Sequence, residues 1–448
     1  MPRMGFNHSV KVPTQYKVAS KILQKYEQEG ASMRNLIYGE KHAKTGSLCG
    51  LITKILEQKP ILEAVIEGSK ILQKETRMNP FLCKILVGEL LFGKGKLTGE
   101  SKPVTTVLSY EKKLRKKYKK ALETSTPIPK MIQNTHPRYV RINTLKVKPR
   151  QILEILSMEE GWRQLPAAAS YTEYLEIIKQ LQDNEFIEDF HVPNLFAFPT
   201  NSRHYWATHR LVEDTSVVLQ HKSSCLAPLL LAPTRKSVVL DMCAAPGLKT
   251  IQMAAMMKNK GTIYATENHY NRFRTLEDFV TKSGSSIVKP MNVDTLGISD
   301  EDVPGVEYIL LDPSCSGSGI IQNIQTRERE EYDEERIGKL SRLQKTLLYH
   351  AMTKYPSVKR IVYSTCSMNV QENEMVVQLM LNKFKNFKLK SPLEQLKGEW
   401  KSFGAGKKTS KCIYALPEVD ATNGFFIAIL ERKGEKKVPE QVQEDQNE

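Results

Sequence analysis

The chain has 448 residues, of which 40% are hydrophobic, and this length is enough for two or three domains with a sizeable core. No apolar run approaches the roughly 18 residues of a membrane-spanning helix, and the N-terminal stretch has no apolar secretory segment, so we expect neither membrane insertion nor secretion. The seven cysteines include no C-x-x-C pair, which argues against a disulfide framework or a metal site and for a reducing compartment.

The formal net charge is +16, and it is unevenly distributed along the chain. Residues 1–150 hold 30 Lys and Arg against 11 Asp and Glu, whereas the remainder holds 36 against 39. This split predicts a polyanion-binding module in the N-terminal third, joined to a near-neutral domain with another task. The densest cluster, EKKLRKKYKK at 111–120, could instead serve solubility or nuclear targeting.

In chain order, the first predicted elements are helices. Residues 15–95 carry apolar residues at three- and four-residue spacing, and STPIPK (125–130) breaks this pattern, so we predict a basic helical domain over residues 1–130. Alternation in RYVRINTLK (138–146) predicts a strand, followed by a helix over 150–162 and a strand over 194–199. Residues 131–208 are therefore predicted to form a small α/β insert with basic residues on its first strand.

The rest of the chain has the pattern of an α/β domain. Short runs rich in Val and Ile alternate with segments of helical length from about residue 209 to 432, which predicts βα units on a Rossmann-like, doubly wound sheet. GFFIAIL (424–430) supplies the last strand of this sheet. The polar tail, residues 433–448, is predicted to be disordered.

A cofactor site is predicted where VVLDMCAAPGLKT (238–250) passes from a strand through a turn of small residues into a helix. The turn is neither GxGxxG nor a P-loop, which weakens dinucleotide and nucleoside triphosphate interpretations. Acids follow the next three predicted strands: Glu267, where ribose hydroxyls would bind, Asp294, within reach of an adenine amine, and Asp312. This ordered series predicts S-adenosylmethionine; the alternative is an α/β domain whose acids only cap turns and helices.

Two cysteines stand just past predicted strands, Cys315 in YILLDPSCSGSG (308–319) and Cys366 in RIVYSTCSMNVQENE (360–374). A thiolate that adds to carbon 6 of a pyrimidine makes carbon 5 nucleophilic, and a second group must later remove the carbon 5 hydrogen. Two cysteines at one sheet edge suit these tasks, and Asp312 could share a proton with N3. Asn369 and Glu372 resemble a capping box, which predicts a helix starting just past Cys366. The alternative is that both cysteines are merely small buried residues.

These motifs together resemble a known family. DMCAAPGLKT, LLDPSCSGSG and YSTCS followed by QENE, in that order and after RYVRINTLK, resemble the Sun/Fmu family of RNA cytosine-5 methyltransferases over roughly residues 135–432. Within the family, the chain most resembles the eukaryotic branch called nucleolar Sun-domain member five. The resemblance implies a class I methyltransferase fold, S-adenosyl-L-methionine as cofactor, and large-subunit ribosomal RNA or a pre-ribosome as partner. It also implies residence in the nucleus and nucleolus, and we expect a monomer.

The resemblance implies roles for residues at the cofactor. Glu267 would bind the ribose, Asp294 the adenine, and Arg272 matches a cofactor-site arginine of the family, while Asp312 would face the cofactor and the cytosine. The family turn often reads APGGKT, and we expect Leu248, which replaces its second glycine, to adopt ordinary backbone angles. The turn that would hold the methionine moiety comprises Cys243, Ala244, Ala245, Pro246, Gly247, Leu248 and Lys249.

For the substrate, the resemblance implies that Cys366 is the nucleophile and that Cys315 assists release, an order that the residues alone leave open. Asp-Pro-Ser-Cys departs from the commoner Asp-x-Pro-Cys, so the turn before Cys315 could differ from that of the family. RNA would bind the basic helical domain and the first strand of the insert. The candidate RNA contacts are Lys112, Lys113, Arg115, Lys116, Lys117, Arg138 and Arg141.

Two other functions remain open at this point. The first is a catalytically silent RNA-binding ribosome-assembly factor on the same fold, which would bind the cofactor without transferring a methyl group. The second is a DNA or protein methyltransferase, which a covalent adduct formed with RNA but not with duplex DNA would exclude. The presence of Cys315, Cys366 and Asp312 together favours the RNA cytosine-5 methyltransferase.

Overall fold

The computed structural model describes residues 11–29, 36, 45–124, 136–320 and 330–433. The predicted domain end at residue 130 lies outside these ranges. The predicted disordered tail also lies outside them, except for its first residue, 433. The chain forms two compact units. We call residues 1–133 with 324–332 the helical unit, and residues 134–323 with 333–448 the α/β unit. In the described ranges, no helix is long and apolar enough to cross a membrane.

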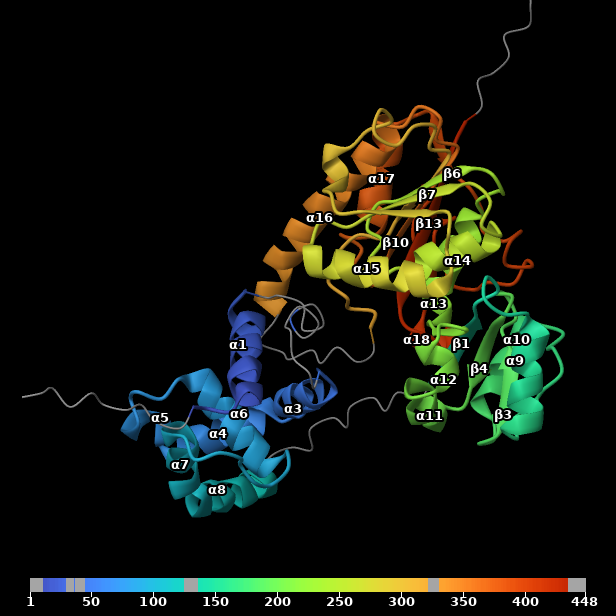
Figure 1. Ribbon diagram of the computed structural model, residues 1–448. Helices are drawn as coiled ribbons and strands as arrows, with labels where there is room; N and C mark the ends of the chain where they lie inside the picture. The colour runs from blue at the N-terminus through green and yellow to red at the C-terminus, as the bar shows by residue number, and fades with distance from the viewer. Residues whose placement is uncertain (1–10, 30–35, 37–44, 125–135, 321–329, 434–448) are drawn as a thin grey trace, which may run out of the picture. The chain divides into compact units, whose positions relative to one another are not determined.

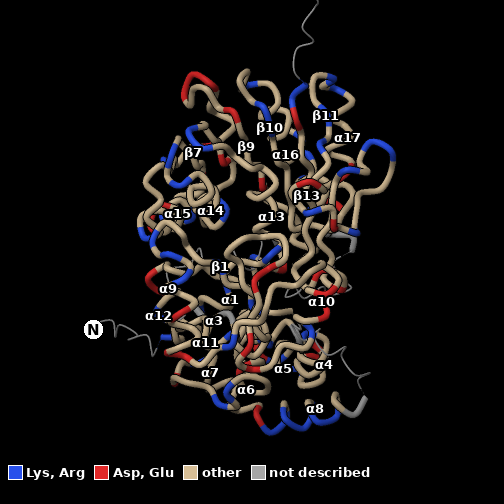
Figure 2. Tube along the Cα trace, turned by 90° about the vertical axis from the view of Figure 1, so that its right-hand side faces the viewer, with Lys and Arg blue, Asp and Glu red and all other residues tan. Residues whose placement is uncertain are grey.

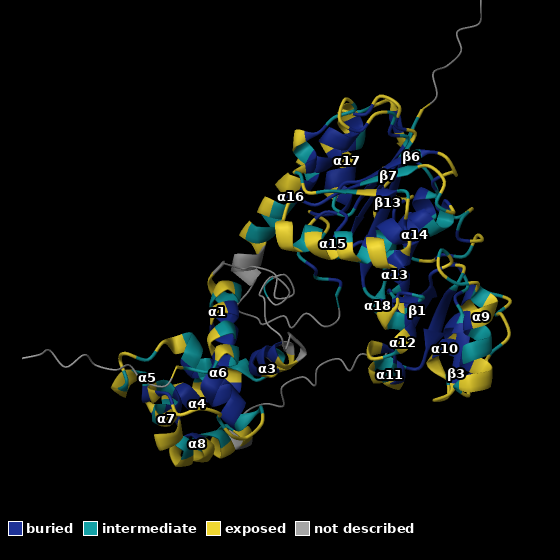
Figure 3. Cartoon of the chain, in the orientation of Figure 1, coloured by how far each residue is buried: buried dark blue, intermediate teal, exposed yellow. Residues whose placement is uncertain are grey.

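The helical unit is built around α6 (Pro80–Leu91), whose side chains are buried along most of its length (Figure 3). Asn79 caps this helix by accepting a hydrogen bond from Leu82 N at 2.9 Å, and Pro80 occupies the first turn, where no donor is needed. Gly88 lets α3 approach closely, because a Cβ there would lie 2.4 Å from Cγ1 of Ile55. The other helices are α1 (Thr14–Glu29), α3 (Thr45–Glu57), α4 (Lys59–Ser69), α5 (Ile71–Lys74), α7 (Lys102–Ser109) and α8 (Glu111–Thr124).

The α/β unit begins with a small sheet of order β2-β3-β4-β1-β5. Its strands are β1 (Arg138–Ile142), β2 (Arg163–Gln164), β3 (Glu185–Glu188), β4 (Leu195–Phe198) and β5 (Val217–Leu219), and its helices are α9 (Pro149–Glu154), α10 (Tyr171–Lys179), α11 (Arg203–Ala207) and α12 (Arg210–Glu213). The sheet extends through β5, past the boundary at residue 208 expected from sequence. Only the first part of the helix expected over 150–162 is α-helical, as α9. A π-helical turn over Ile155–Glu159 follows it.

The large sheet has the order β11-β13-β10-β9-β6-β7-β8, with β12 paired to β13. Figure 1 labels β6, β7, β10 and β13 of this sheet. Strands β6 to β10 are mutually parallel, whereas β13 runs antiparallel to β10 and β11. The strands are β6 (Val238–Asp241), β7 (Thr262–Thr266), β8 (Val288–Met291), β9 (Tyr308–Leu311), β10 (Arg360–Thr365), β11 (Phe387–Leu389), β12 (Ile413–Ala415) and β13 (Phe425–Arg432).

Helices cover both faces of the large sheet, which confirms the predicted doubly wound fold. Val239 faces a core formed with α13 (Lys222–Leu231), α14 (Leu248–Met256) and α15 (Tyr270–Ser283). The next residue, Leu240, faces a second core formed with α16 (Glu330–Thr353) and α17 (Glu374–Lys383). This alternation follows from the period of two in a strand, so the apolar runs seen in the sequence are buried from both sides.

The small sheet and the large sheet share one hydrophobic core, which includes Tyr139 of β1 and Leu226 of α13. Within it, Lys222 Nζ lies 2.9 Å from Asp189 Oδ2, and both side chains are fully buried. The Lys222 ammonium also lies 4.3 Å from the centre of the Tyr171 ring. Because a buried ion pair requires close geometry, this contact holds the small sheet in a defined position on the large one.

We predict that Asp189→Asn lowers the free energy of unfolding by about 3–5 kcal/mol, because it leaves the Lys222 charge buried without its partner. The amide can still accept the hydrogen bonds from His191 N and Val192 N, so the variant removes mainly the charge. Thermal unfolding measures the loss, and Asp189→Asn/Lys222→Met should recover most of it. A double variant less stable than the single one would contradict this account.

The contribution of the Asp189–Lys222 ion pair to the free energy of unfolding should also depend on pH. Burial raises the pKa of Asp189, but the Lys222 cation, the nearby His191 and backbone donors outweigh burial and leave the pKa lowered. A lowered folded-state pKa gives stability that is complete above the ordinary aspartate pKa and is lost as pH falls through the folded value. The stability difference between the wild-type protein and Asp189→Asn should therefore shrink in acid.

Candidate active site

The predicted site residues follow the carboxyl ends of neighbouring parallel strands. The turn that starts at Cys243 follows β6, Glu267 follows β7, Asp294 follows β8, Asp312 follows β9 and Cys366 follows β10. Because the strand order is β10-β9-β6-β7-β8, these residues are distributed along one edge of the large sheet. In open α/β sheets this edge is where ligands bind.

The turn after β6 is shaped by Pro246 and Gly247. The Ala245–Pro246 bond is cis. Gly247 has a φ of 108°, a backbone conformation that residues other than glycine rarely adopt. Gly247 N donates to Ala244 O at 2.8 Å, which closes the turn. Leu248 is the first residue of α14, and its φ is not positive, as we expected. The turn therefore presents the N-terminus of α14 toward the strand edge.

Glu267 and Arg272 join the second strand end to this turn. Glu267 is buried, with its Oε2 3.2 Å from Arg272 Nη1 and its Oε1 accepting a hydrogen bond from His269 N. Arg272 Nη2 in turn donates to Ala245 O at 3.0 Å. Asp294, by contrast, is exposed and accepts a hydrogen bond from Leu296 N, so it caps a short turn. The structure thus connects two of the expected cofactor residues and leaves the third facing solvent.

Sequence reasoning missed one acid, which binds the helix that follows this turn. Asp241, the last residue of β6, is buried and accepts a hydrogen bond from Thr250 Oγ1 at 2.7 Å. Burial raises the pKa of Asp241 to about 7, which exceeds the opposing effect of the Thr250 hydrogen bond. An acid at the end of the apolar run VVLD was the signal available in the sequence.

Lys249 and Asp312 form an ion pair between the cofactor turn and the strands that carry the cysteines. Lys249 Nζ lies 2.5 Å from Asp312 Oδ2, and Ser364 Oγ donates to Asp312 Oδ1 at 2.7 Å. Burial lowers the pKa of Lys249, but the Asp312 carboxylate outweighs it and leaves the pKa raised, so Lys249 is a cation. Ser364 is the contact that sequence reasoning did not identify.

The two cysteines lie together. Cys315 Sγ and Cys366 Sγ are 3.0 Å apart, and both residues are half-buried. The hydrogen bond with Cys366, followed by burial, raises the pKa of Cys315 well above its ordinary value. The Cys315 thiol therefore holds its proton more firmly than an ordinary cysteine does.

The helix expected just past Cys366 is absent, and that prediction was wrong. The helix α17 begins only at Glu374, with Asn373 before it. Asn369 Nδ2 does donate to Glu372 Oε2 at 3.0 Å, but Glu372 also accepts a hydrogen bond from Ser316 N at 2.9 Å. The two polar side chains thus bind the neighbouring Cys315 loop, a long-range contact that the local capping pattern could not reveal.

Arg141 cannot reach an RNA phosphate, so this expected contact was wrong. Its side chain is buried, with Nε donating to Gln220 Oε1 at 2.8 Å and Nη2 lying 3.4 Å from Leu248 O. Arg141 therefore supports the turn that ends in α14. Arg138 is partly buried, and burial, with the nearby Arg203, lowers its pKa to about 10.

Lys and Arg residues colour much of the α8 trace blue in Figure 2. Lys112, Lys113, Arg115 and Lys116 are exposed and Lys117 is half-buried, while Leu114 packs into the core. Lys113 Nζ donates to Ser69 O at 2.5 Å, and Arg115 pairs with Glu111 of the same helix. Most of the expected α8 contacts are thus accessible.

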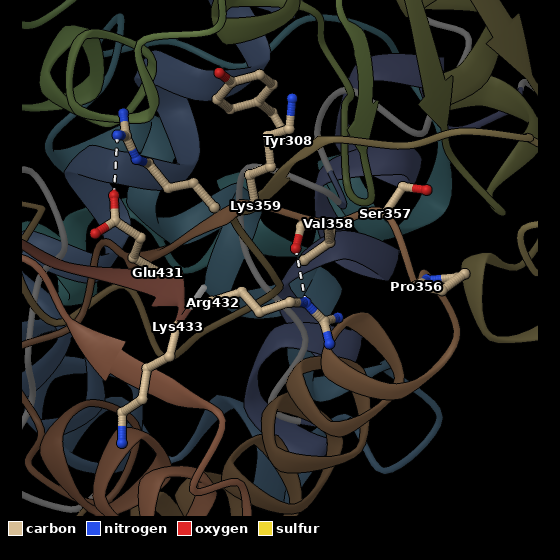
Figure 4. A pocket seen from close by; sticks show the side chains of 9 residues that line it. Tyr308, Pro356, Ser357, Val358, Lys359, Glu431, Arg432 and Lys433 are labelled. Carbon is tan, nitrogen blue, oxygen red and sulfur yellow. Dashed lines mark hydrogen bonds and ion pairs between the residues drawn. The ribbon is translucent and has the colours of Figure 1, made fainter. Parts of the chain in front are cut away.

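A cavity of about 470 Å³ lies at the opposite end of the strands from the cysteines (Figure 4). It is next to Tyr308 and Arg360, the first residues of β9 and β10. Arg360 pairs with Glu431 at 3.2 Å, and Arg432 Nε donates to Val358 O at 2.8 Å. None of the expected site residues lines this cavity, so it is separate from the candidate active site. In the described ranges, no cluster of His, Cys, Asp and Glu could hold a metal ion.

Comparison with known proteins identifies the three segments of the chain. Residues 47–136 match the NOL1/NOP2/Sun domain family member 5 N-terminal domain, residues 136–220 its ferredoxin-like domain, and residues 228–431 the 16S rRNA methyltransferase RsmB/F family. The solved structure titled "Crystal Structure of PH0851" aligns with a TM-score of 0.60 at 21% identity, covering 95% of this chain and all of that one. At this identity, the likeness supports the fold.

Whole-length relatives specify the family. The Drosophila melanogaster 28S rRNA (cytosine-C(5))-methyltransferase is 43% identical over 96% of this chain and 99% of its own length. The Mus musculus protein of the same name is 33% identical over 93% and 90%, and the Schizosaccharomyces pombe 25S rRNA (cytosine-C(5))-methyltransferase rcm1 is 30% identical over 93% and 90%. The chain therefore belongs to the member 5 branch of the Sun-domain family of S-adenosylmethionine-dependent cytosine-C5 methyltransferases.

Proposed function

We propose that this protein transfers a methyl group from S-adenosylmethionine to carbon 5 of a cytosine in large-subunit ribosomal RNA, through a covalent bond between Cys366 and carbon 6. The observation that carries the proposal is the pair of cysteine sulfurs 3.0 Å apart, at the strand edge that also holds Lys249 and Asp312. The names of the 28S and 25S rRNA relatives support RNA of the large subunit as the substrate class.

The residues at the strand edge suit the cofactor. Gly247 has a left-handed φ, and a Cβ there would lie 3.0 Å from Leu276 Cδ1, so glycine lets α15 pack closely against the turn that would hold the cofactor. Glu267, held by Arg272, would accept hydrogen bonds from the ribose hydroxyls, and the solvent-facing Asp294 would bind the adenine amine. The methionine moiety would lie against the turn 243–249. The bound cofactor supplies a methyl group whose carbon accepts an electron pair.

Cys366 begins the reaction as a thiolate. Its sulfur forms a bond to carbon 6 of the cytosine, and the electron pair of the carbon 5–carbon 6 double bond becomes available at carbon 5 for the methyl group. Asp312 is placed beside both the cofactor turn and Ser364 of β10, where it can share a proton with N3 as charge develops on the ring. Lys249 keeps a positive charge next to this carboxylate.

Cys315 completes the reaction by accepting the carbon 5 proton. Once Cys366 is bonded to carbon 6, its thiolate no longer holds the Cys315 proton; Cys315 then gives this proton to solvent, and it is the net proton that the reaction releases. When Cys315 takes the carbon 5 hydrogen, the carbon 5–carbon 6 double bond forms again and the bond to Cys366 breaks. Cys366 leaves as a thiolate and Cys315 is again a thiol, so the pair returns to its starting protonation state.

The other parts of the chain provide RNA binding. We assign residues 1–130 to a basic RNA-binding domain, residues 131–208 with β5 to a second RNA-binding subdomain, and the following residues to 432 to methyl transfer. The exposed lysines of α8 support phosphate binding, and a base flipped out of its stack would give Cys366 access to carbon 6. We also propose that the protein is a monomer and that it resides in the nucleolus. No observation favours the silent assembly factor.

Cys315→Ala should trap the enzyme on its RNA, because it removes the release group and keeps the nucleophile. Cells expressing this variant should contain an RNA-linked form that survives denaturing electrophoresis, and sequencing the attached RNA would identify the cytosine. The Cys315→Ala/Cys366→Ala variant should show no such band. If the band persists without Cys366, or appears with Cys366→Ala alone, the assignment of the two cysteines is reversed or wrong.

Asp312→Asn should slow single-turnover methyl transfer by about 10²–10⁴-fold, the range typical for loss of a general acid or base. The amide keeps an acceptor for Ser364 Oγ but loses the ion pair with Lys249 and the carboxyl group that would share a proton with N3. Transfer of labelled methyl groups to RNA measures the rate. Ser364→Ala serves as control, with a smaller effect expected. Equal rates for Asp312→Asn and the wild-type enzyme would remove Asp312 from the mechanism.

Replacing three exposed cations of α8, Lys112→Ala/Arg115→Ala/Lys116→Ala, should weaken RNA binding without changing the bound methyl-transfer rate. The dependence of log affinity on log salt should flatten by about 2, because each lost phosphate contact contributes roughly 0.7–0.9 to the slope. Filter binding at several salt concentrations measures this slope. The matched control is Lys407→Ala/Lys408→Ala/Lys411→Ala in the α/β unit, and an equal loss there would show that only total charge matters.

A further inference from the structure

A buried carboxylate lies behind the two cysteines. Glu372 has no exposed surface, and among the described residues no lysine or arginine pairs with it. Four uncharged groups bind its oxygens instead. Oε1 accepts from Ser316 N at 2.9 Å and Gln344 Nε2 at 3.0 Å, and Oε2 accepts from Ser367 Oγ at 2.6 Å and Asn369 Nδ2 at 3.0 Å. A buried anion held this fully is a strong local constraint.

Two of these donors belong to the residues that directly follow the cysteines. Ser316 follows Cys315 and Ser367 follows Cys366, so one carboxylate is bonded to both cysteine loops. The serines are also joined to each other, with Ser316 Oγ and Ser367 Oγ 3.0 Å apart. The loops follow different strands, β9 and β10. Glu372 connects the two loops through the residues that come directly after the two cysteines in the sequence.

The charge of Glu372 acts on the same pair. Burial raises the pKa of Glu372, but its four hydrogen bonds outweigh burial and lower it, so the carboxylate stays ionised. Together with the Cys366 hydrogen bond and burial, this negative charge raises the pKa of Cys315. The other titratable groups that face the two thiols are Asp312, which also raises the pKa of Cys315, the Lys249 cation and the neutral Tyr363.

We propose that Glu372 is a positioning residue for the reaction: it ties the Cys315 and Cys366 loops together and helps to keep the proton on Cys315, so that the sulfur of Cys366 is the one that attacks. The inference deepens the proposed function and rests on it for the roles of the two sulfurs. Glu372 reaches the chemistry only through Ser316, Ser367 and its charge, so it does not touch the substrate. The hydrogen bonds that place it all lie within the α/β unit.

The test uses alkylation of the two thiols, which requires no RNA. The reduced full-length protein is pulsed with iodoacetamide over a pH series, and peptide mass spectrometry measures the labelling of Cys366 and Cys315 separately. In the wild-type protein, Cys366 should react first. Glu372→Gln removes the charge and at least one acceptor, so the ratio of Cys366 to Cys315 labelling should fall about tenfold. The onset of Cys315 labelling should move to lower pH.

The same variant should lower single-turnover methyl transfer by about 100-fold, because small displacements of reacting groups have effects of this size. Its affinity for S-adenosylmethionine should change little. The matched control is Glu374→Gln, the same substitution two residues later, where the carboxylate binds Tyr414 Oη instead of the cysteine loops. An unchanged labelling ratio in Glu372→Gln, or an equal change in Glu374→Gln, overturns the proposal.

A second variant covers the case in which Glu372→Gln does not fold. Ser367→Ala removes one donor on the Cys366 side and leaves the Glu372 charge, so a smaller fall in the labelling ratio supports the proposal and an unchanged ratio overturns it. The labelling also separates this inference from the proposed reaction. If the wild-type protein methylates no RNA but the ratio still falls in Glu372→Gln, the positioning role stands and the proposed function fails.

Discussion

The parallel pairing of β9 with β10 is the constraint on which the candidate active site depends. Its register places Leu311 opposite Tyr363, so the next residues, Asp312 and Ser364, come opposite each other and share a 2.7 Å hydrogen bond. β9 ends at Leu311 and β10 ends at Thr365, and the loops that follow carry Cys315 and Cys366. A shift by one residue would turn every side chain to the other face and separate the sulfurs. The site therefore inherits its geometry from the backbone hydrogen bonds of the sheet.

A second constraint joins the small sheet to the cofactor turn. The buried pair of Lys222 and Asp189 lies in a core that belongs to both sheets, and Arg141 extends from β1 to the carbonyl of Leu248. Charged side chains are costly to bury, so each of these contacts requires its partner at a defined distance. A surface that binds RNA on the small sheet would thus be held at a fixed distance from the methyl-transfer edge.

The sequence predicted the doubly wound sheet, the strand ends and the place of both cysteines, because apolar runs and small-residue turns are local signals. It could not predict β5, which is only three residues long, or the end of the small sheet that β5 sets. Arg141 was misjudged because the alternation of a strand shows which face a residue occupies but not what packs there. Asn369 and Glu372 were misjudged because a capping pattern describes only neighbours in sequence, whereas their partners include Ser316, more than fifty residues away.

The distribution of charge at this edge explains why two cysteines can act as different groups. Isolated thiols of equal exposure would ionise alike, but the hydrogen bond with Cys366, burial and the charges of Glu372 and Asp312 raise the pKa of Cys315. In the proposed reaction, Cys315 therefore holds a proton before the substrate binds, and the reaction restores this state at its end. Because Glu372 and Asp312 sit on loops fixed by the β9–β10 register and by the hydrogen bonds of Glu372, we attribute the proposed difference between nucleophile and release group to the folded chain itself.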